Sequence, residues 1–188
     1  MSLFNSLPQI LFFGLVIFLV GFLILCFKKS DKNLTLIIGA IGFWLLATGF
    51  LSVNGFFLKY DVLPSRIMFA VFPMVLLLIY TSISSKALTL AAHIPQTWLI
   101  HVQTFRIVME IILWMLAKQH IIPEIMTWDG HNFDIVVGIT APFVAYLCFT
   151  AKKWGKNVAL IWNVIGMLFL INVFGQGLLS APTPFQVF

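Results

Sequence analysis

The chain has 188 residues, of which 61% are hydrophobic and only 9% are charged, whereas a soluble domain carries about 25% charged residues. This composition excludes an ordinary soluble domain and predicts an all-α polytopic membrane protein. At about 20 residues per membrane-spanning helix, the length fits six helices in a single transmembrane domain. The net charge of +5 comes from lysines between apolar segments, which act as topology signals, so no nucleic-acid partner is expected.

Six apolar segments separated by polar connections predict the six helices of the bundle. Pro8 is expected at the start of the first helix, where proline is favoured. Pro73 and Pro142 fall inside the third and fifth helices, where each removes a backbone hydrogen bond and kinks the helix. The predicted spans are approximately Leu7–Phe27, Leu34–Asn54, Arg66–Ile83, Thr97–Ala117, Asn132–Ala151 and Asn157–Leu179.

Lysine and arginine residues between the spans predict the orientation of the bundle. The first, third and fifth connections hold seven of them, and the second and fourth hold three. Because basic connections stay in the cytoplasm, both chain ends are predicted to lie outside. The polar connection from Lys118 to His131 would then face the periplasm or its equivalent. The expected location is the bacterial inner membrane, with membrane lipids as partners.

Two hairpins of the chain resemble each other in sequence. Residues 28–46 align without gaps to residues 152–170, with nine identities in nineteen positions. The two hairpins would also have the same orientation. The similarity predicts a parallel duplication, in which the first and second helices correspond to the fifth and sixth.

The fourth segment, Thr97–Ala117, carries ionisable groups through its middle. At 100° per residue, Gln103, Arg106 and Glu110 fall on one stripe of a helix. A charged side chain near the bilayer centre costs roughly 2.5 to 3.5 kcal/mol on insertion scales. The stripe must therefore face protein or water, and charged groups inside a membrane point to function.

Other polar residues are expected in the outer half of the bundle, given a rise of about 1.5 Å per residue. Thr48 and Asn172 would lie at about the depth of Glu110, Gln176 one turn nearer the outer surface, and Asp134 just inside the outer edge. They come from the second, fifth and sixth helices: Thr48, Asp134, Asn172 and Gln176. With the stripe, they predict an outward-facing polar cavity. Arg106 would contact an anionic group through its planar guanidinium, and Glu110 would hold Arg106 or carry a proton.

Two other interpretations of these residues remain open. Arg106 and Glu110 can form an ion pair on one helix that fixes packing without any function. The outer connection also holds possible metal ligands, but they follow no fixed ligand spacing, so no metal is predicted. The candidates for such a site are His120, Glu124, His131 and Asp134.

These observations give one leading functional hypothesis and two alternatives. The leading hypothesis is a small transporter or channel-like protein that binds a small polar, anionic solute. The first alternative is a membrane-embedded enzyme that acts on a lipid or other amphipathic substrate, with Glu110, His131 and Asp134 as acid/base or metal-binding groups. The second is a noncatalytic assembly subunit. The sequence names no cofactor, and a homo-oligomer is compatible with so short a chain.

Overall fold

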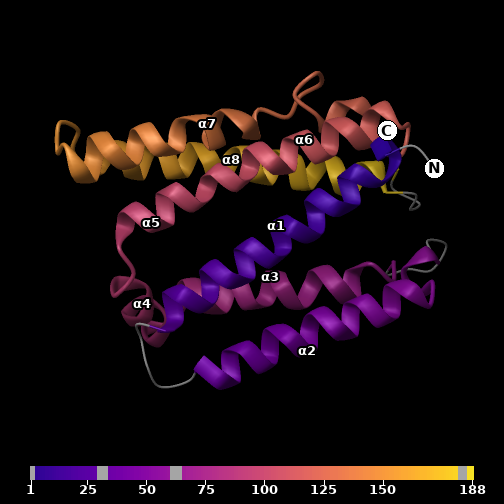
Figure 1. The fold of residues 1–188 in the computed structure, drawn as a ribbon, viewed down its shortest axis with the longest axis horizontal. Helices are drawn as coiled ribbons and strands as arrows, with labels where there is room; N and C mark the ends of the chain where they lie inside the picture. The colour runs from indigo at the N-terminus through magenta and orange to yellow at the C-terminus, as the bar shows by residue number, and fades with distance from the viewer. Residues whose placement is uncertain (1–2, 29–33, 60–64, 182–185) are drawn as a thin grey trace. The chain divides into compact units, whose positions relative to one another are not determined.

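The computed structural model describes residues 3–28, 34–59, 65–181 and 186–188, and within these ranges the chain is helical and contains no strand (Figure 1). The chain forms two compact units. The first contains residues 3–20, 95–181 and 186–188, and the second contains residues 21–28, 34–59 and 65–94. The prediction of an all-α protein is therefore confirmed.

The first unit contains the long helices of the C-terminal half. Helix α1, Leu3–Lys28, contributes its first part to this unit and its second part to the other. The remaining elements of the first unit are α5 (Gln96–His101), η2 (Val102–Thr104), α6 (Phe105–Lys118), η3 (Glu124–Met126), α7 (Asp134–Ala145), η4 (Tyr146–Thr150) and α8 (Lys156–Ser180). Those of the second unit are α2 (Leu34–Val53), η1 (Phe56–Leu58), α3 (Met68–Ile83) and α4 (Ser85–Ala92).

In the part of the chain that the structure describes, three helical stretches are long and apolar enough, by length and composition, to cross a membrane. They are Ser6–Cys26 with 21 residues, Gln96–Lys118 with 23 and Lys156–Ser180 with 25. Three shorter apolar helices, Ile38–Val53, Met68–Ile83 and Asp134–Thr150, coincide with the other predicted spans. The chain thus has the helices of a membrane-integrated protein.

The helix boundaries differ from the prediction at three places. Pro8 lies inside α1 and not at its start, because the helix already begins at Leu3. Residues 85–92, predicted as part of a connection, form α4. The fourth predicted span is helical throughout, but its middle tightens into the 3₁₀ turn η2 before α6 begins.

Helix α6 ends in a turn that directs the chain back over its own last residues. His120 adopts a left-handed backbone conformation with φ 57°. This allows the N–H of Ile121 to donate to the carbonyl of Leu116 at 3.0 Å, a common way to close a helix. The connection of residues 119–133 therefore starts packed against the end of α6.

Helix α7 is regular only as far as Ala145 and then widens into the π-helical turn η4. Pro142 lies inside α7 and cannot donate the backbone hydrogen bond of a regular helix. At the end of η4 the N–H of Ala151 donates to the carbonyl of Tyr146 at 2.7 Å, five residues back, which is the spacing of a π turn. The predicted fifth span therefore ends in a bend.

Small residues let helices α6, α7 and α8 approach one another closely. A Cβ at Gly138 of α7 would lie 2.8 Å from the side chain and 3.0 Å from the backbone nitrogen of Ile107 in α6. At Gly166 of α8 a Cβ would lie 3.2 Å from Val137. The apolar core lies next to these contacts and consists of Ile100, Ala141, Val144, Ala145, Cys148 and Ala159. The close approach brings α7 and α8 against the polar stripe of α6.

Candidate functional site

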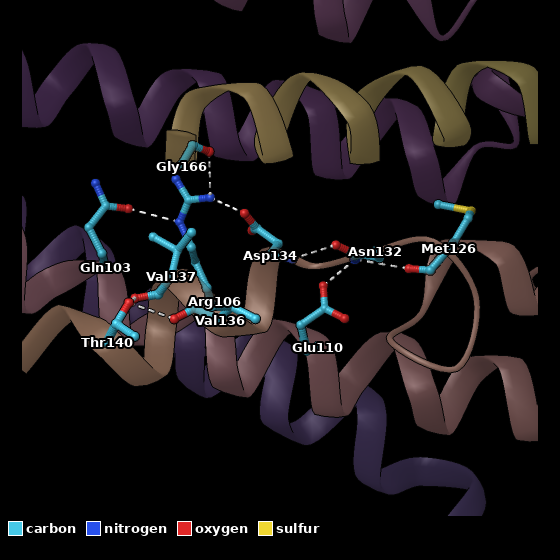
Figure 2. A network of polar contacts seen from close by, with 10 residues as sticks. All are labelled: Gln103, Arg106, Glu110, Met126, Asn132, Asp134, Val136, Val137, Thr140 and Gly166. Atoms are coloured by element: carbon cyan, nitrogen blue, oxygen red, sulfur yellow. Dashed lines mark hydrogen bonds and ion pairs between the residues drawn. The ribbon is translucent and has the colours of Figure 1, made fainter. Parts of the chain in front are cut away.

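Arg106, on α6, is bonded to both α7 and α8. Its Nε donates to Oε1 of Gln103 at 2.9 Å, one turn earlier. Its Nη1 donates to Oδ1 of Asp134, at the start of α7, and to the carbonyl oxygen of Gly166 in α8 at 3.3 Å (Figure 2). Arg106 and Asp134 are only 6% and 7% exposed. The pair is therefore a buried ion pair that ties α6 to α7 and α8.

Asn132 connects this ion pair to Glu110. Its side chain is fully buried. Its Nδ2 donates to Oε1 of Glu110 and to the carbonyl oxygen of Met126 at 3.0 Å, and its Oδ1 accepts from the backbone N–H of Asp134 at 2.9 Å (Figure 2). Asn132 thus holds the end of the connection in place and links the carboxyl group of Glu110 to the backbone of Asp134.

Glu110 is the most deeply buried ionisable group of the network, with 1% exposure. One carboxyl oxygen accepts from Asn132, and the other, Oε2, is buried without a hydrogen-bond partner among the residues that the structure describes. Figure 2 shows the first oxygen directed at Asn132 and the second directed away from it. A buried acceptor without a donor is costly, so Glu110 Oε2 marks a place where a donor or a cation is missing.

Helix α8 closes the network from the other side through two amide side chains. Nδ2 of Asn172 and Nε2 of Gln176 both donate to the backbone carbonyl of His131, at 2.8 and 3.3 Å. Gln176 is 7% exposed, and its Oε1 is also buried without a partner in the described part of the chain. A second unsatisfied acceptor therefore lies where α8 meets the connection that carries Asn132.

The charges of the network do not cancel. Arg106 forms its ion pair with Asp134 and not with Glu110, so an ion pair of Arg106 and Glu110 on one helix, one of the interpretations of the sequence, is wrong. The close packing at Gly138 explains this, because it brings α7 across the face of α6. With all three groups ionised, the network carries a net charge of −1, located on Glu110.

The connection of residues 119–133 packs on the C-terminal end of α6. The rings of Trp114 and Trp128 stack at 5.8 Å, and the indole N–H of Trp114 donates to Oδ2 of Asp129 at 3.2 Å. Lys118 pairs with Glu124 at 2.9 Å and with Asp129 at 3.4 Å. These contacts fasten the connection over the end of the helix that carries Glu110.

Six of the seven predicted ligand-binding residues lie in or beside this network: Gln103, Arg106, Glu110, Asp134, Asn172 and Gln176. The seventh, Thr48, belongs to the second unit, where its hydroxyl donates to the carbonyl of Trp44 at 2.7 Å in its own helix. Their roles in binding remain predictions.

The possible metal ligands are not gathered into one cluster. His120 and Glu124 are exposed, and Glu124 pairs with Lys118. His131 is also exposed and contributes its backbone carbonyl to the network. Within residues 3–28, 34–59, 65–181 and 186–188, no three His, Cys, Asp or Glu residues lie together so as to hold a metal ion.

Two important members of the network were not predicted as site residues. Asn132 is only the first residue of the predicted fifth span, and Gly166 lies inside the predicted sixth span. The turn at Asp129-Gly130 indicates where the side chain of Asn132 lies. A Cβ at Gly130 would lie 2.5 Å from the backbone of Ile125, so the chain folds back tightly at this turn. Asn132, two residues later, is therefore directed toward α6. Gly166 acts through a backbone carbonyl, which no side-chain pattern reveals.

The comparisons with known proteins identify one family. No curated protein and no solved structure matches the chain. The sequence pattern of a family described as a domain of unknown function (DUF8737) matches residues 63–187. The matched range covers more than half of the chain and includes every residue of the polar network. The chain therefore belongs to the DUF8737 family.

Proposed function

We propose that this protein is a small transporter or channel-like membrane protein that binds a small polar solute at the network of Arg106, Asp134 and Glu110. One observation carries the proposal: Glu110 is 1% exposed, lies on a helical stretch apolar enough to cross a membrane, and has an unpartnered oxygen. A charged side chain inside a bilayer is energetically unfavourable, and charged residues there commonly mark ion or substrate paths.

The proposed architecture is the six-helix bundle with both chain ends outside and the basic connections in the cytoplasm. It is supported by the three long apolar stretches and by the three shorter apolar helices at the other predicted spans. The duplicated hairpins are part of the proposal, and each aligned segment runs from the end of one apolar helix into the next. A bacterial inner membrane remains the proposed location.

The fixed charges favour a cationic solute over the anionic solute predicted from the sequence. Asp134 already occupies the guanidinium of Arg106, so an anion would have to displace a buried carboxylate. Glu110 Oε2 and Gln176 Oε1 both lack a donor, and a cation that carries N–H groups supplies donors and neutralises the charge. Because both side chains are buried, the solute would enter when the connection of residues 119–133 moves away from α6.

A structural role is the second candidate, and the geometry of Arg106 favours it. This side chain is bonded to Gln103, Asp134 and Gly166, so it can fix the packing of three helices in an assembly subunit. An enzyme is less well supported, since Asp134 is held in an ion pair and the His131 side chain is exposed, away from the buried carboxyls.

The experiment is a thermal-stability measurement on the purified protein with salts of matched ionic strength. The salts are the chlorides of guanidinium, methylammonium and sodium at millimolar concentrations, and sodium acetate and phosphate. A ligand of the folded state stabilises by about 2.7 kcal/mol at one hundred times its dissociation constant. The variants are Glu110→Gln and, as a matched control, Glu124→Gln, which makes the same substitution at an exposed residue.

The proposal predicts that an N–H cation raises the midpoint of wild type and Glu124→Gln above the sodium chloride value, and that Glu110→Gln does not respond. If no salt discriminates between the three proteins, and Glu110→Gln is merely less stable, the network is structural. If acetate or phosphate is the ligand that stabilises, the preference for a cation is wrong.

A further inference from the structure

The unsatisfied atoms of the network are all of one kind. Both buried atoms of its side chains that lack a partner in the described structure, Glu110 Oε2 and Gln176 Oε1, are hydrogen-bond acceptors. An ionised carboxylate offers acceptors only. The hydrogen bonds of the neighbouring donors go to other atoms: Nη1 of Arg106 donates to Asp134 and Gly166, and Nδ2 of Asn132 donates to Oε1 of Glu110 and to Met126. Glu110 Oε2 is therefore suited to a positive charge or a donor hydrogen.

Three occupants could supply this positive charge or donor hydrogen in the absence of solute. A water molecule would donate to the acceptors but would leave the charge of Glu110 buried without an ion-pair partner, which costs several kcal/mol. A hard metal cation prefers about six oxygen ligands, whereas the nearby carbonyls of Met126 and His131 already accept hydrogen bonds. A proton on Oε2 removes the charge and converts this oxygen into a donor.

We propose that Glu110 is a proton-binding site, which carries an exchangeable proton on Oε2 when the site is empty and releases it when a cationic solute binds. The inference rests on the proposed function only for the second step. On solute binding, the O–H bond at Glu110 breaks, the carboxylate keeps the electron pair, the proton passes to water, and the solute cation takes its place. The charge of the site is the same before and after, so the exchange is electroneutral there.

The charged groups around Glu110 agree with this assignment. Asp134 on α7 is negative and bonded to the same Asn132 that bonds Glu110, and Arg106 on α6 is occupied by Asp134. The exposed His131 lies on the connection, and α8 contributes only the amides of Asn172 and Gln176. No group in this set gives Glu110 an ion-pair partner, so its negative charge stays unbalanced unless it is protonated.

Infrared spectroscopy of the full chain in nanodiscs tests the first step without any ligand. A protonated carboxylic acid has a C=O stretching band that a carboxylate lacks, and this band shifts in D₂O. We expect one such band at neutral pH in wild type and in the control Glu124→Gln, and none in Glu110→Gln. Glu110→Asp keeps the carboxyl group, so it should keep an acid band at a shifted position. A shifted band in this variant assigns the band to the carboxyl group at position 110 and not to a change in folding.

Addition of guanidinium chloride tests the second step. The acid band of wild type should disappear as guanidinium saturates the site, with one proton released per protein to a pH indicator. A wild-type spectrum without an acid band, or a band that survives in folded Glu110→Gln, overturns the proton site. A band that is present but unaffected by any cation leaves the proton site standing and removes the exchange, and the thermal-stability panel reports independently whether a solute binds.

Discussion

The ion pair of Arg106 and Asp134 gives the sharpest quantitative prediction. Both residues are less than 10% exposed, and removal of one partner of a buried pair costs about 3–5 kcal/mol because the other charge is left unpaired. Asp134→Asn keeps an oxygen that can accept from Arg106, so its cost should fall near 3 kcal/mol. Arg106→Gln loses the bonds to both Asp134 and Gly166 and should cost about 4 kcal/mol.

The double variant Arg106→Gln/Asp134→Asn separates the charge effect from ordinary loss of contacts. With both charges removed, neither is left buried and unpaired, so the double variant should be more stable than the sum of the single variants predicts. We expect a coupling of about 3 kcal/mol. The assay is reversible unfolding of all four proteins in mixed micelles, with helix content as the signal. Additivity within about 0.5 kcal/mol would refute the pairing described above.

Three further substitutions test the packing that builds the site. Gly138→Ala places a methyl group 3.0 Å from a backbone nitrogen of α6 and should destabilise by about 1–2 kcal/mol in the same unfolding assay; Gly175→Ala, which meets no atom within 4 Å, should be neutral or stabilising. Gly130→Ala meets backbone atoms at 2.5 and 2.6 Å and should cost about 3 kcal/mol; a neutral result would show that the connection is not folded as described. Thr140→Val removes the hydroxyl that accepts from the indole N–H of Trp162 at 2.9 Å, so it should cost about 1 kcal/mol and change the tryptophan fluorescence, and an unchanged spectrum would contradict this contact.

The sequence predicted the elements of the first unit well because its signals are local. Apolar length alone placed the helices, and the i, i+3 spacing of Gln103 and Arg106 predicted that they share a face, which the hydrogen bond between them confirms. Lys118 and Asp129 were recognised as polar residues of a connection. Each of these inferences depends on residues a few positions apart.

The pairing inside the site could not be predicted in the same way. Asp134 lies 28 residues from Arg106, and the choice between Asp134 and Glu110 as its partner is made by how closely α6 and α7 approach at Gly138. That distance is a property of the packed helices. The same holds for Asn132, which reaches Glu110 only because the connection folds back over α6.

Backbone details were also beyond the sequence pattern. Proline at position 142 predicted a kink, but not the π turn that follows four residues later. Pro8 predicted the start of the first helix, but it lies inside α1, which begins at Leu3. A proline near the beginning of a helix therefore does not mark its first residue.

The central claim is that the protein binds and moves a cationic solute at Glu110, and it is tested most directly by the uptake of radiolabelled guanidinium into proteoliposomes. Guanidinium stays charged at every accessible pH, so passive leakage as a neutral molecule is negligible. We expect saturable uptake for wild type and for Glu124→Gln, and its loss in Glu110→Gln. Equal uptake by all three proteins, or no uptake by a wild type that guanidinium stabilises, would contradict this claim.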